Sequence, residues 1–124
     1  MAVSAITIDH DKVLLVRRSP RNPEMWAPPG GKVERNEHLI QAVERETREE
    51  IGVTLHPLRL LAQIELHMSD RSFALFSFLC DVINEPSALV PSSDALDLHW
   101  WRFEEAIRVP LAPGVFTVLR HLTQ

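Results

Sequence analysis

The sequence predicts an α/β fold in which helices cover a β-sheet, built as a single domain over residues 1–124. Short apolar segments separated by turn residues predict strands, and two segments with helical periodicity interrupt them. A chain of 124 residues is long enough for one hydrophobic core and too short for two ordinary domains. Strands interleaved with helices favour a sheet that is covered on both faces.

The expected strands form two pairs and a single late strand. Residues 3–8 and 13–17 flank the polar turn 9–12, a composition typical of a hairpin. Residues 58–66 and 72–82 form a second pair around residues 68–71, and residues 98–103 follow a proline-containing loop. We therefore expect five strands.

Two helices are expected, at residues 37–51 and 113–122. Asn36 suits the N-cap of the first helix, and Gly52 suits the left-handed position after its end. Pro113 suits the first turn of the second helix. One stripe of the first helix is expected to pack on the sheet, and it consists of Ile40, Val43, Thr47 and Ile51.

The composition of the chain argues against a nucleic-acid-binding protein and against a membrane-spanning one. A net charge of −4 argues against a general nucleic-acid surface, which would be basic overall. No apolar run reaches the roughly 18 residues of a membrane span, and the N-terminus lacks a secretory signal, so we expect a cytoplasmic protein with no membrane partner. Cys80 lies in an apolar run and is expected to be a buried structural thiol.

Three carboxylates are the most informative feature of the chain. Glu46, Glu49 and Glu50 fall on one face of the first expected helix, shortly after a proline and glycine loop at residues 26–31. Such a cluster is usually a solvated helix face. With no clustered cysteine or histidine nearby, its oxygen atoms would otherwise suit a hard cation, Mg²⁺ or Mn²⁺.

The surrounding spacing sets this cluster apart from an ordinary acidic helix. Gly31 is followed after five residues by Glu37, after seven more by Arg45-Glu46, and then by Glu49-Glu50, Gly52 and Val53. In this pattern the chain resembles the Nudix hydrolase family. One position departs from the family pattern, because Thr47 stands where an aliphatic residue is usual.

The resemblance implies a Nudix-type α/β/α sandwich with a mixed sheet, and hydrolysis of a phosphoanhydride with Mg²⁺ as the cofactor. Glu49 and Glu50 would be the main metal ligands, with the Gly30 carbonyl. Glu46 would complete the metal shell or act as the base. Arg45 and Glu37 would form a structural ion pair that holds the loop against the helix.

A further acidic ligand is expected from a later loop. Residues 100–106 and 109–113 resemble a Trp-x-x-x-Glu-Glu-Ala and Pro-Leu-Ala-Pro pattern of the CTP pyrophosphohydrolase branch. This alignment puts Asp94 at the acidic position, with Asp97 as the alternative. An ordinary loop aspartate is an equally good interpretation of either residue.

Candidate substrate-binding residues lie around the glycine loop. Arg17 and Arg18 precede it, where they would meet an anionic substrate or form a solvated strand end. Gly31 lets the backbone approach phosphates closely. Trp26 or Phe78 is a candidate for stacking on a nucleobase, although aromatic residues more often supply core area.

Missing subfamily marks favour a small nucleotide substrate, a nucleoside triphosphate cleaved to a monophosphate and pyrophosphate. The chain contains no tyrosine, no proline near Met68, and Pro113 where oxidised-purine hydrolases carry asparagine. An ADP-ribose or nucleotide-sugar pyrophosphatase is the alternative, and a non-catalytic nucleotide-binding module is an alternative of another class. The resemblance also makes a homodimer one expectation.

Overall fold

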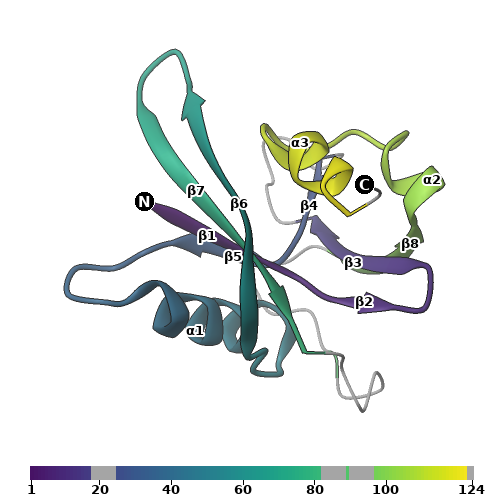
Figure 1. Cartoon of the computed structure of the whole chain (residues 1–124), viewed down its shortest axis with the longest axis horizontal. Helices are drawn as coiled ribbons and strands as arrows, with labels where there is room; N and C mark the ends of the chain where they lie inside the picture. The colour runs from purple at the N-terminus through teal and green to yellow at the C-terminus, as the bar shows by residue number, and fades with distance from the viewer. Residues whose placement is uncertain (18–24, 82–88, 90–96, 123–124) are drawn as a thin grey trace.

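Two four-stranded sheets and three helices make up the chain in the computed structural model, which describes residues 1–17, 25–81, 89 and 97–122 (Figure 1). The first sheet has the order β5-β1-β7-β6 and comprises β5 (Gly30–Lys32), β1 (Ala2–Ile6), β7 (Ser72–Cys80) and β6 (Pro57–His67). β1 and β7 are parallel and the other pairs are antiparallel, so this sheet is mixed.

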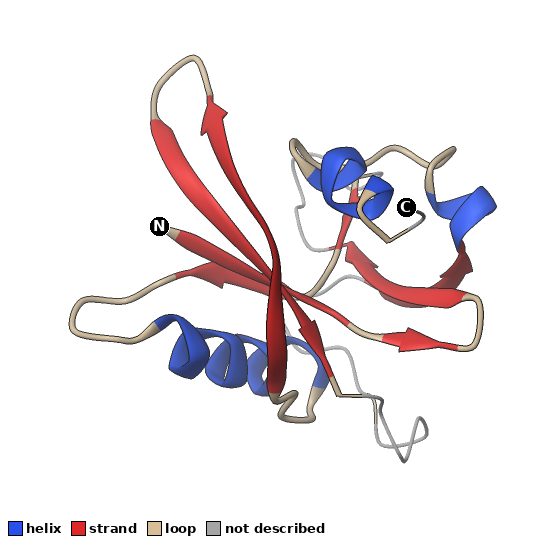
Figure 2. Cartoon of the chain, in the orientation of Figure 1, coloured by secondary structure: helices blue, strands red, loops and turns tan. Residues whose placement is uncertain are grey.

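The second sheet is antiparallel and smaller. It comprises β2 (Ile8–Asp9), β3 (Lys12–Arg17), β4 (Trp26–Ala27) and β8 (Asp97–Arg102), with β3 paired to all three others. The helix α1 (Leu39–Ile51) lies along the first sheet, whereas α2 (Phe103–Ala106) and α3 (Val115–Arg120) lie near the second (Figure 2). The predicted α/β class with a mixed sheet and helices is confirmed.

β3 connects the two halves of the core. Its residues from Val13 to Val16 are completely buried, as a continuous apolar run predicts for a strand covered on both faces. Leu14 and Val16 pack in the cluster that includes α1, whereas Val13 and Leu15 pack in the cluster that includes α3. The alternation of side chains along this strand therefore divides one core into two connected clusters.

The expected hairpin of residues 3–8 with 13–17 is wrong in its pairing. β1 pairs with β5 and β7 in the first sheet, and only the short β2 pairs with β3. The chain crosses between the sheets at Thr7, whose hydroxyl donates to the Asp81 carbonyl at 3.0 Å. β4, β5 and α2 were not expected, because segments of two to four residues carry no periodicity.

α1 begins two residues later than the sequence predicts. His38, not Asn36, is the N-cap, and its backbone N–H donates to the Gln41 side chain at 2.9 Å. Asn36 instead adopts a left-handed conformation with φ of 64°, which belongs to the preceding turn. Gly52 ends the helix in the expected left-handed conformation, whereas Ile40 is 53% exposed and does not belong to the buried stripe.

Thr47, the residue that departs from the aliphatic pattern, is fully buried and hydrogen-bonded. Its hydroxyl donates to the Val43 carbonyl at 2.9 Å and accepts the backbone N–H of Leu55 at 3.0 Å. The threonine thus ties the buried side of α1 to the segment that leads into β6.

Cys80 is 3% exposed in the core, as predicted, and burial raises the pKa of its thiol to about 12. None of the helices in the described part of the chain is long and apolar enough to cross a membrane.

Candidate functional site

α1 presents its three motif glutamates at different depths. Glu50 points towards the sheet and is 4% exposed, the Glu46 side chain is largely buried, and half of the Glu49 side chain is exposed. The gradient follows from direction around the helix, because at about 100° per residue Glu50 faces the sheet while the adjacent Glu49 faces solvent. The group therefore forms an edge between the helix and β5.

The loop backbone meets the deepest of these carboxylates. The Gly30 N–H donates to Glu50 Oε1 at 3.3 Å. Gly30 also pairs with Ser4 of β1, and a Cβ at position 30 would collide with the Val3 carbonyl oxygen and lie 2.8 Å from the Ser4 Cα. Only glycine allows this approach of β5 to β1 while the amide faces the glutamate.

Gly31 brings the same backbone against a second carboxylate. A Cβ at this position would lie 2.5 Å from Glu46 Oε1 and 2.8 Å from Glu46 Oε2. The Glu46 carboxylate therefore occupies the space beside the bare backbone of β5, and any side chain at position 31 would displace it.

Arg45 organises the acidic residues into one network. Its Nε and Nη2 donate to the two Glu37 oxygens at 2.7 and 3.0 Å, a bidentate pair. Nη1 donates to Glu46 at 2.9 Å and to Glu49 at 3.3 Å, and Nη2 also reaches the Lys32 carbonyl at 2.9 Å. The guanidinium thus fixes the loop, the helix and β5 relative to one another.

The pairing of Arg45 with Glu37 shifts the pKa values of both side chains. The hydrogen bonds from Arg45 lower the pKa of Glu37 from 4.5 to about 2, against a smaller opposing effect of burial. The Glu37 side chain also raises the pKa of Arg45 above its ordinary value, so the pair stays charged at neutral pH. The structure contains the ion pair that the sequence predicts between these two residues.

The three glutamates do not converge on a single point in this structure. Among the described residues, no group of three histidine, cysteine or acidic side chains is close enough to hold a metal ion. The reason lies in the contacts already described, since Arg45 draws Glu46 and Glu49 to its Nη1 while Glu50 turns to the Gly30 amide. The assignment of Glu46, Glu49 and Glu50 as metal ligands stays a prediction.

The donor set still fits a hard divalent ion. Glu46, Glu49 and Glu50 lie within one and a half turns of helix and offer only oxygen atoms, the ligand type that Mg²⁺ and Mn²⁺ prefer. Glu46 lies against the backbone of Gly31, which brings the carboxylate and the backbone of β5 close together.

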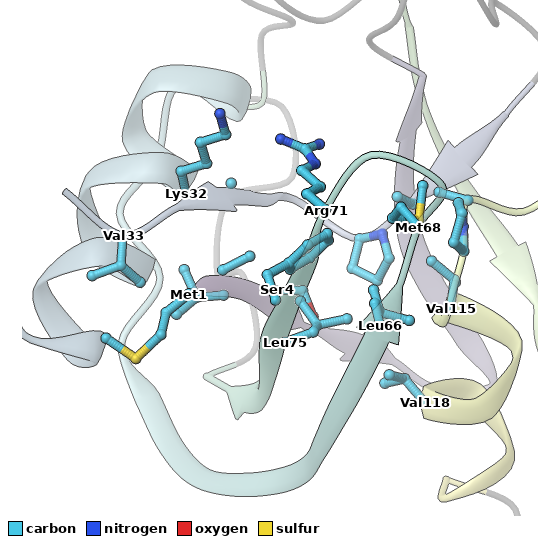
Figure 3. A pocket seen from close by; sticks show the side chains of 18 residues that line it. Met1, Ser4, Lys32, Val33, Leu66, Met68, Arg71, Leu75, Val115 and Val118 are labelled. Carbon is cyan, nitrogen blue, oxygen red and sulfur yellow. The ribbon is translucent and has the colours of Figure 1, made fainter.

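A pocket of about 460 Å³ opens beside β5 (Figure 3). Its lining is mostly apolar and comes from β1, β5, the β6–β7 hairpin, and residues 112–118 around the start of α3. Lys32 and Arg71 lie on one side of it, and their charged ends point away from Leu75 and Val118 (Figure 3). Gly31 lines this pocket and also abuts Glu46, so the two regions are adjacent.

Arg17 and Trp26 form a separate contact outside this pocket lining. The Arg17 guanidinium lies 5.2 Å from the Trp26 ring centroid and 3.5 Å from Asp97 Oδ2, while the Trp26 ring packs edge-on against Trp101. The Trp26 backbone bonds to the segment that enters the pocket wall, because its N–H donates to the Pro110 carbonyl at 2.8 Å and its carbonyl accepts the Ala112 N–H at 2.9 Å.

The structure places two of the other expected site residues, Phe78 and Asp97. Phe78 is 8% exposed and packs in the core cluster that includes α1, so stacking on a nucleobase does not fit its position. Asp97, the alternative acidic ligand, contacts Arg17 and its own strand. Arg18 and Asp94 lie outside the described residues.

Sequence reasoning missed the polar residues of the pocket, Ser4, Lys32 and Arg71. They come from three separate segments that carry no common motif. Among the lining residues, Gly31 and the Pro-Leu-Ala-Pro residues Ala112 and Pro113 were indicated by sequence patterns.

Comparison with known proteins gives matches over most of the chain. The family model of the NUDIX domain matches residues 1–122. The chain is 30% identical to the CTP pyrophosphohydrolase of Escherichia coli K12 over 119 residues, which span 94% of this chain and 86% of that protein. It is 31% identical to the 8-oxo-dGTP diphosphatase of the same strain over 83 residues, 65% of this chain and 64% of that protein.

Solved structures agree with these matches. The solution structure of the Escherichia coli ORF135 protein superposes with a TM-score of 0.83 at 29% identity, covering 98% of this chain and 86% of that one. The crystal structure of the MutT protein from Methanosarcina mazei Go1 has the same fold, with a TM-score of 0.85 at 24% identity over 98% of this chain and 91% of that one.

Proposed function

The chain belongs to the Nudix family of hydrolases, and on this premise we propose that it cleaves a nucleoside triphosphate to a monophosphate and pyrophosphate with Mg²⁺. It is a hydrolase of nucleotide phosphoanhydride bonds, as its named relatives are. The observation that supports a nucleotide hydrolase most directly is the position of Gly31, which lines the pocket and abuts Glu46. The choice of a triphosphate follows from the sequence marks described above.

Gly31 lies between the pocket, which would bind the nucleoside, and the glutamates, which would hold the metal ion. A nucleoside held in the pocket would direct its phosphates along β5 towards Glu46, because the backbone there carries no side chain. A volume of about 460 Å³ lies within the range of roughly 300–1,000 Å³ found for small-molecule sites. Lys32 and Arg71 at the rim supply positive charge for the anionic chain of phosphates.

Glu46, Glu49, Glu50 and the Gly30 carbonyl would hold the Mg²⁺ ion, with Mn²⁺ as a substitute, and Asp94 is a further proposed ligand. When bound, the ion neutralises charge on the phosphoryl oxygens and acidifies or orients the attacking water.

The remaining steps belong to side chains of the network. Glu46, held by Arg45 at 2.9 Å, is proposed either to complete this set of metal ligands or to accept the proton of the attacking water. Arg45 positions Glu46 and Glu49 together, and the bidentate bond to Glu37 fixes its guanidinium. Arg17, stacked over Trp26, is a second proposed contact for the substrate's negative charge.

The base is assigned from likeness and from the pocket wall. The Escherichia coli relative that matches 94% of this chain is named for CTP, which makes CTP the first substrate to test. Pro113 lines the pocket and has neither a side-chain amide nor a backbone N–H, so it offers no hydrogen-bond donor to a base.

A substrate screen with a matched pair of variants tests the proposal. Nucleoside triphosphates, ADP-ribose, nucleotide sugars and dinucleotide polyphosphates are incubated with Mg²⁺, and released phosphate and pyrophosphate are measured. Glu49→Gln is expected to lower kcat by at least about 100-fold. Glu44→Gln is the control on the same helix, because the Glu44 carboxylate faces His56 at 2.7 Å, and it is expected to retain the wild-type rate.

Two results would contradict the proposal. Release of pyrophosphate from no triphosphate, combined with cleavage of ADP-ribose or a nucleotide sugar, would reassign the substrate class. Nucleotide binding without any hydrolysis would identify a regulatory module.

A further inference from the structure

Two serine hydroxyls form a buried pair at the floor of the pocket. Ser4 on β1 and Ser77 on β7 are register partners on parallel strands, and their Oγ atoms lie 2.6 Å apart. Ser77 is fully buried and Ser4 is 5% exposed. The two hydroxyls are hydrogen-bonded to each other, and the pocket lining around Ser4 is mostly apolar.

Ser4 is the side of this pair that reaches the pocket. Of the lining residues in the described part of the chain, only Ser4, Lys32 and Arg71 have polar side chains. Figure 3 shows Ser4 among Met1, Leu75 and Leu66, while Lys32 and Arg71 stand apart at the charged side. A base enclosed by the apolar walls would therefore meet Ser4 as its nearest side-chain hydrogen-bonding group.

The pair has hydrogen-bonding capacity beyond its own bond. Two hydroxyls carry two protons, and the bond between them uses one. If Ser77 donates to Ser4, the Ser4 proton remains for a ligand that accepts. If Ser4 donates to Ser77, the Ser4 lone pairs remain for a ligand that donates. Either hydroxyl can be the donor at the observed distance.

We propose that the Ser4–Ser77 hydroxyl pair determines base recognition in this pocket, bonding one polar atom of the nucleobase either as donor or as acceptor. This inference rests on the proposed function, since it requires a nucleoside in the pocket. Ser4 contacts the base, and Ser77 is a positioning residue that reverses the direction of the shared bond. The site therefore accepts an oxo or an amino group at the same place on the base.

This mechanism predicts weak discrimination between amino and oxo bases. A fixed donor would leave an amino group facing a donor and reject it strongly, because a buried polar group without a partner is costly. A reversible pair avoids that cost. The kcat/KM values for CTP and UTP, or for ATP and ITP if purines are preferred, are expected to agree within about 3-fold.

The test uses the full chain with both hydroxyls removed. Ser4→Ala combined with Ser77→Ala leaves no unpaired hydroxyl behind, so the fold is expected to persist, as thermal unfolding will show. The kcat/KM for both bases of the accepted pair should fall about 10-fold, whereas the value for ribose 5-triphosphate, which has no base, should change less than about 2-fold. Ser72→Ala, which removes a β7 hydroxyl outside the pocket lining, should change neither value.

Single substitution keeps the proposal testable if the double variant does not fold. Ser77→Ala leaves Ser4 in the pocket without its partner, and is expected to raise KM for the nucleotides about 3-fold while leaving ribose 5-triphosphate unchanged. Equal loss for nucleotides and for ribose 5-triphosphate would overturn the role in base recognition. So would a wild-type preference of more than about 100-fold between amino and oxo bases.

The outcome separates this inference from the proposed function. If the wild-type protein cleaves no triphosphate, the proposed function itself fails. If the wild type cleaves triphosphates and the serine variants match it on every substrate, only the role of the serine pair fails.

Discussion

The glutamate network and the pocket meet at Gly31, yet they are built in opposite ways. In the network, one guanidinium holds three carboxylates and a backbone carbonyl at 2.7–3.3 Å. In the pocket, three polar side chains stand among apolar walls, and two of them are exposed at the rim. The network is thus held together by charged hydrogen bonds, whereas the pocket offers an apolar shape and few hydrogen-bonding groups.

Substitution of the two adjacent glycines, Gly30 and Gly31, is expected to have the largest effects on stability and activity. Gly30→Ala places a Cβ into the Val3 carbonyl and the Ser4 backbone, which cannot move without separating β5 from β1. We expect a loss of about 3 kcal/mol or more in the free energy of unfolding, measured by urea denaturation. A variant as stable as the wild type would show that β5 is not held as closely as the structure indicates.

Gly31→Ala disturbs the network and spares the fold. The three atoms nearest to its Cβ all belong to the Glu46 carboxylate, the end of a flexible side chain that can move aside. We expect stability within about 1 kcal/mol of the wild type and a kcat about 100-fold lower, because the carboxylate is displaced. Steady-state kinetics with calorimetric unfolding measures both, and an unchanged kcat would separate Glu46 from the reaction.

Thr47→Val tests whether the helix that carries the glutamates is fixed from its buried side. The substitution keeps the shape and leaves the Leu55 N–H without its acceptor. We expect a loss of about 1–3 kcal/mol in unfolding free energy. The matched control is Thr117→Val on the exposed face of α3, where a change of less than about 0.5 kcal/mol is expected. Equal effects at both positions would contradict the proposed anchoring.

Ala112→Leu tests whether the pocket wall affects substrate binding independently of the glutamate network. The larger side chain reduces the space inside the pocket. The hydrogen bond from the Ala112 N–H to the Trp26 carbonyl is expected to remain, because it involves only backbone atoms. We expect KM for the preferred triphosphate to rise about 10-fold with kcat nearly constant, because binding is weakened equally in ground and transition states. A fall in kcat with constant KM would mean that pocket and network are not separate.

Acid titration measures the smallest effect. Because Arg45 lowers the folded-state pKa of Glu37 from 4.5 to about 2, the pair stabilises the fold above pH 4.5, and this contribution is lost as the pH falls towards 2. The gap in unfolding free energy between the wild type and Glu37→Gln should therefore narrow over that range. Glu34→Gln is the control, since Glu34 is 65% exposed and lies 3.6 Å from Arg45. A gap that stays constant down to pH 2 would contradict the pairing.

The fold and the network were largely predictable, because both leave local traces in the sequence. Periodicity located α1 and the long strands β6 and β7, and the fixed spacing from Gly31 to Gly52 located the ion pair of Arg45 with Glu37. Sheet pairing was not predictable in the same way. β1 leaves the expected hairpin because its partners, β5 and β7, are distant in sequence.

The pocket was predictable only in part. Ser4 and Ser77 are 73 residues apart and become a pair only through the parallel alignment of β1 and β7. Arg71 joins Lys32 through the turn of a hairpin that has no motif around it, and Lys32 stands at an unspecified position of the motif that begins at Gly31. Phe78 appeared suited to a nucleobase from its aromatic ring, but the alternation of β7 turns it into the core.

The central claim is that the glutamates of α1 take up a divalent ion at the edge of β5. Titration of the protein with Mn²⁺, followed by electron paramagnetic resonance of the unbound ion, measures this directly in the presence of a non-hydrolysable triphosphate. Saturable uptake is expected for the wild type and for Glu44→Gln, with uptake weakened at least about 10-fold in Glu49→Gln. Equal uptake by all three proteins, or no uptake by the wild type, would contradict it.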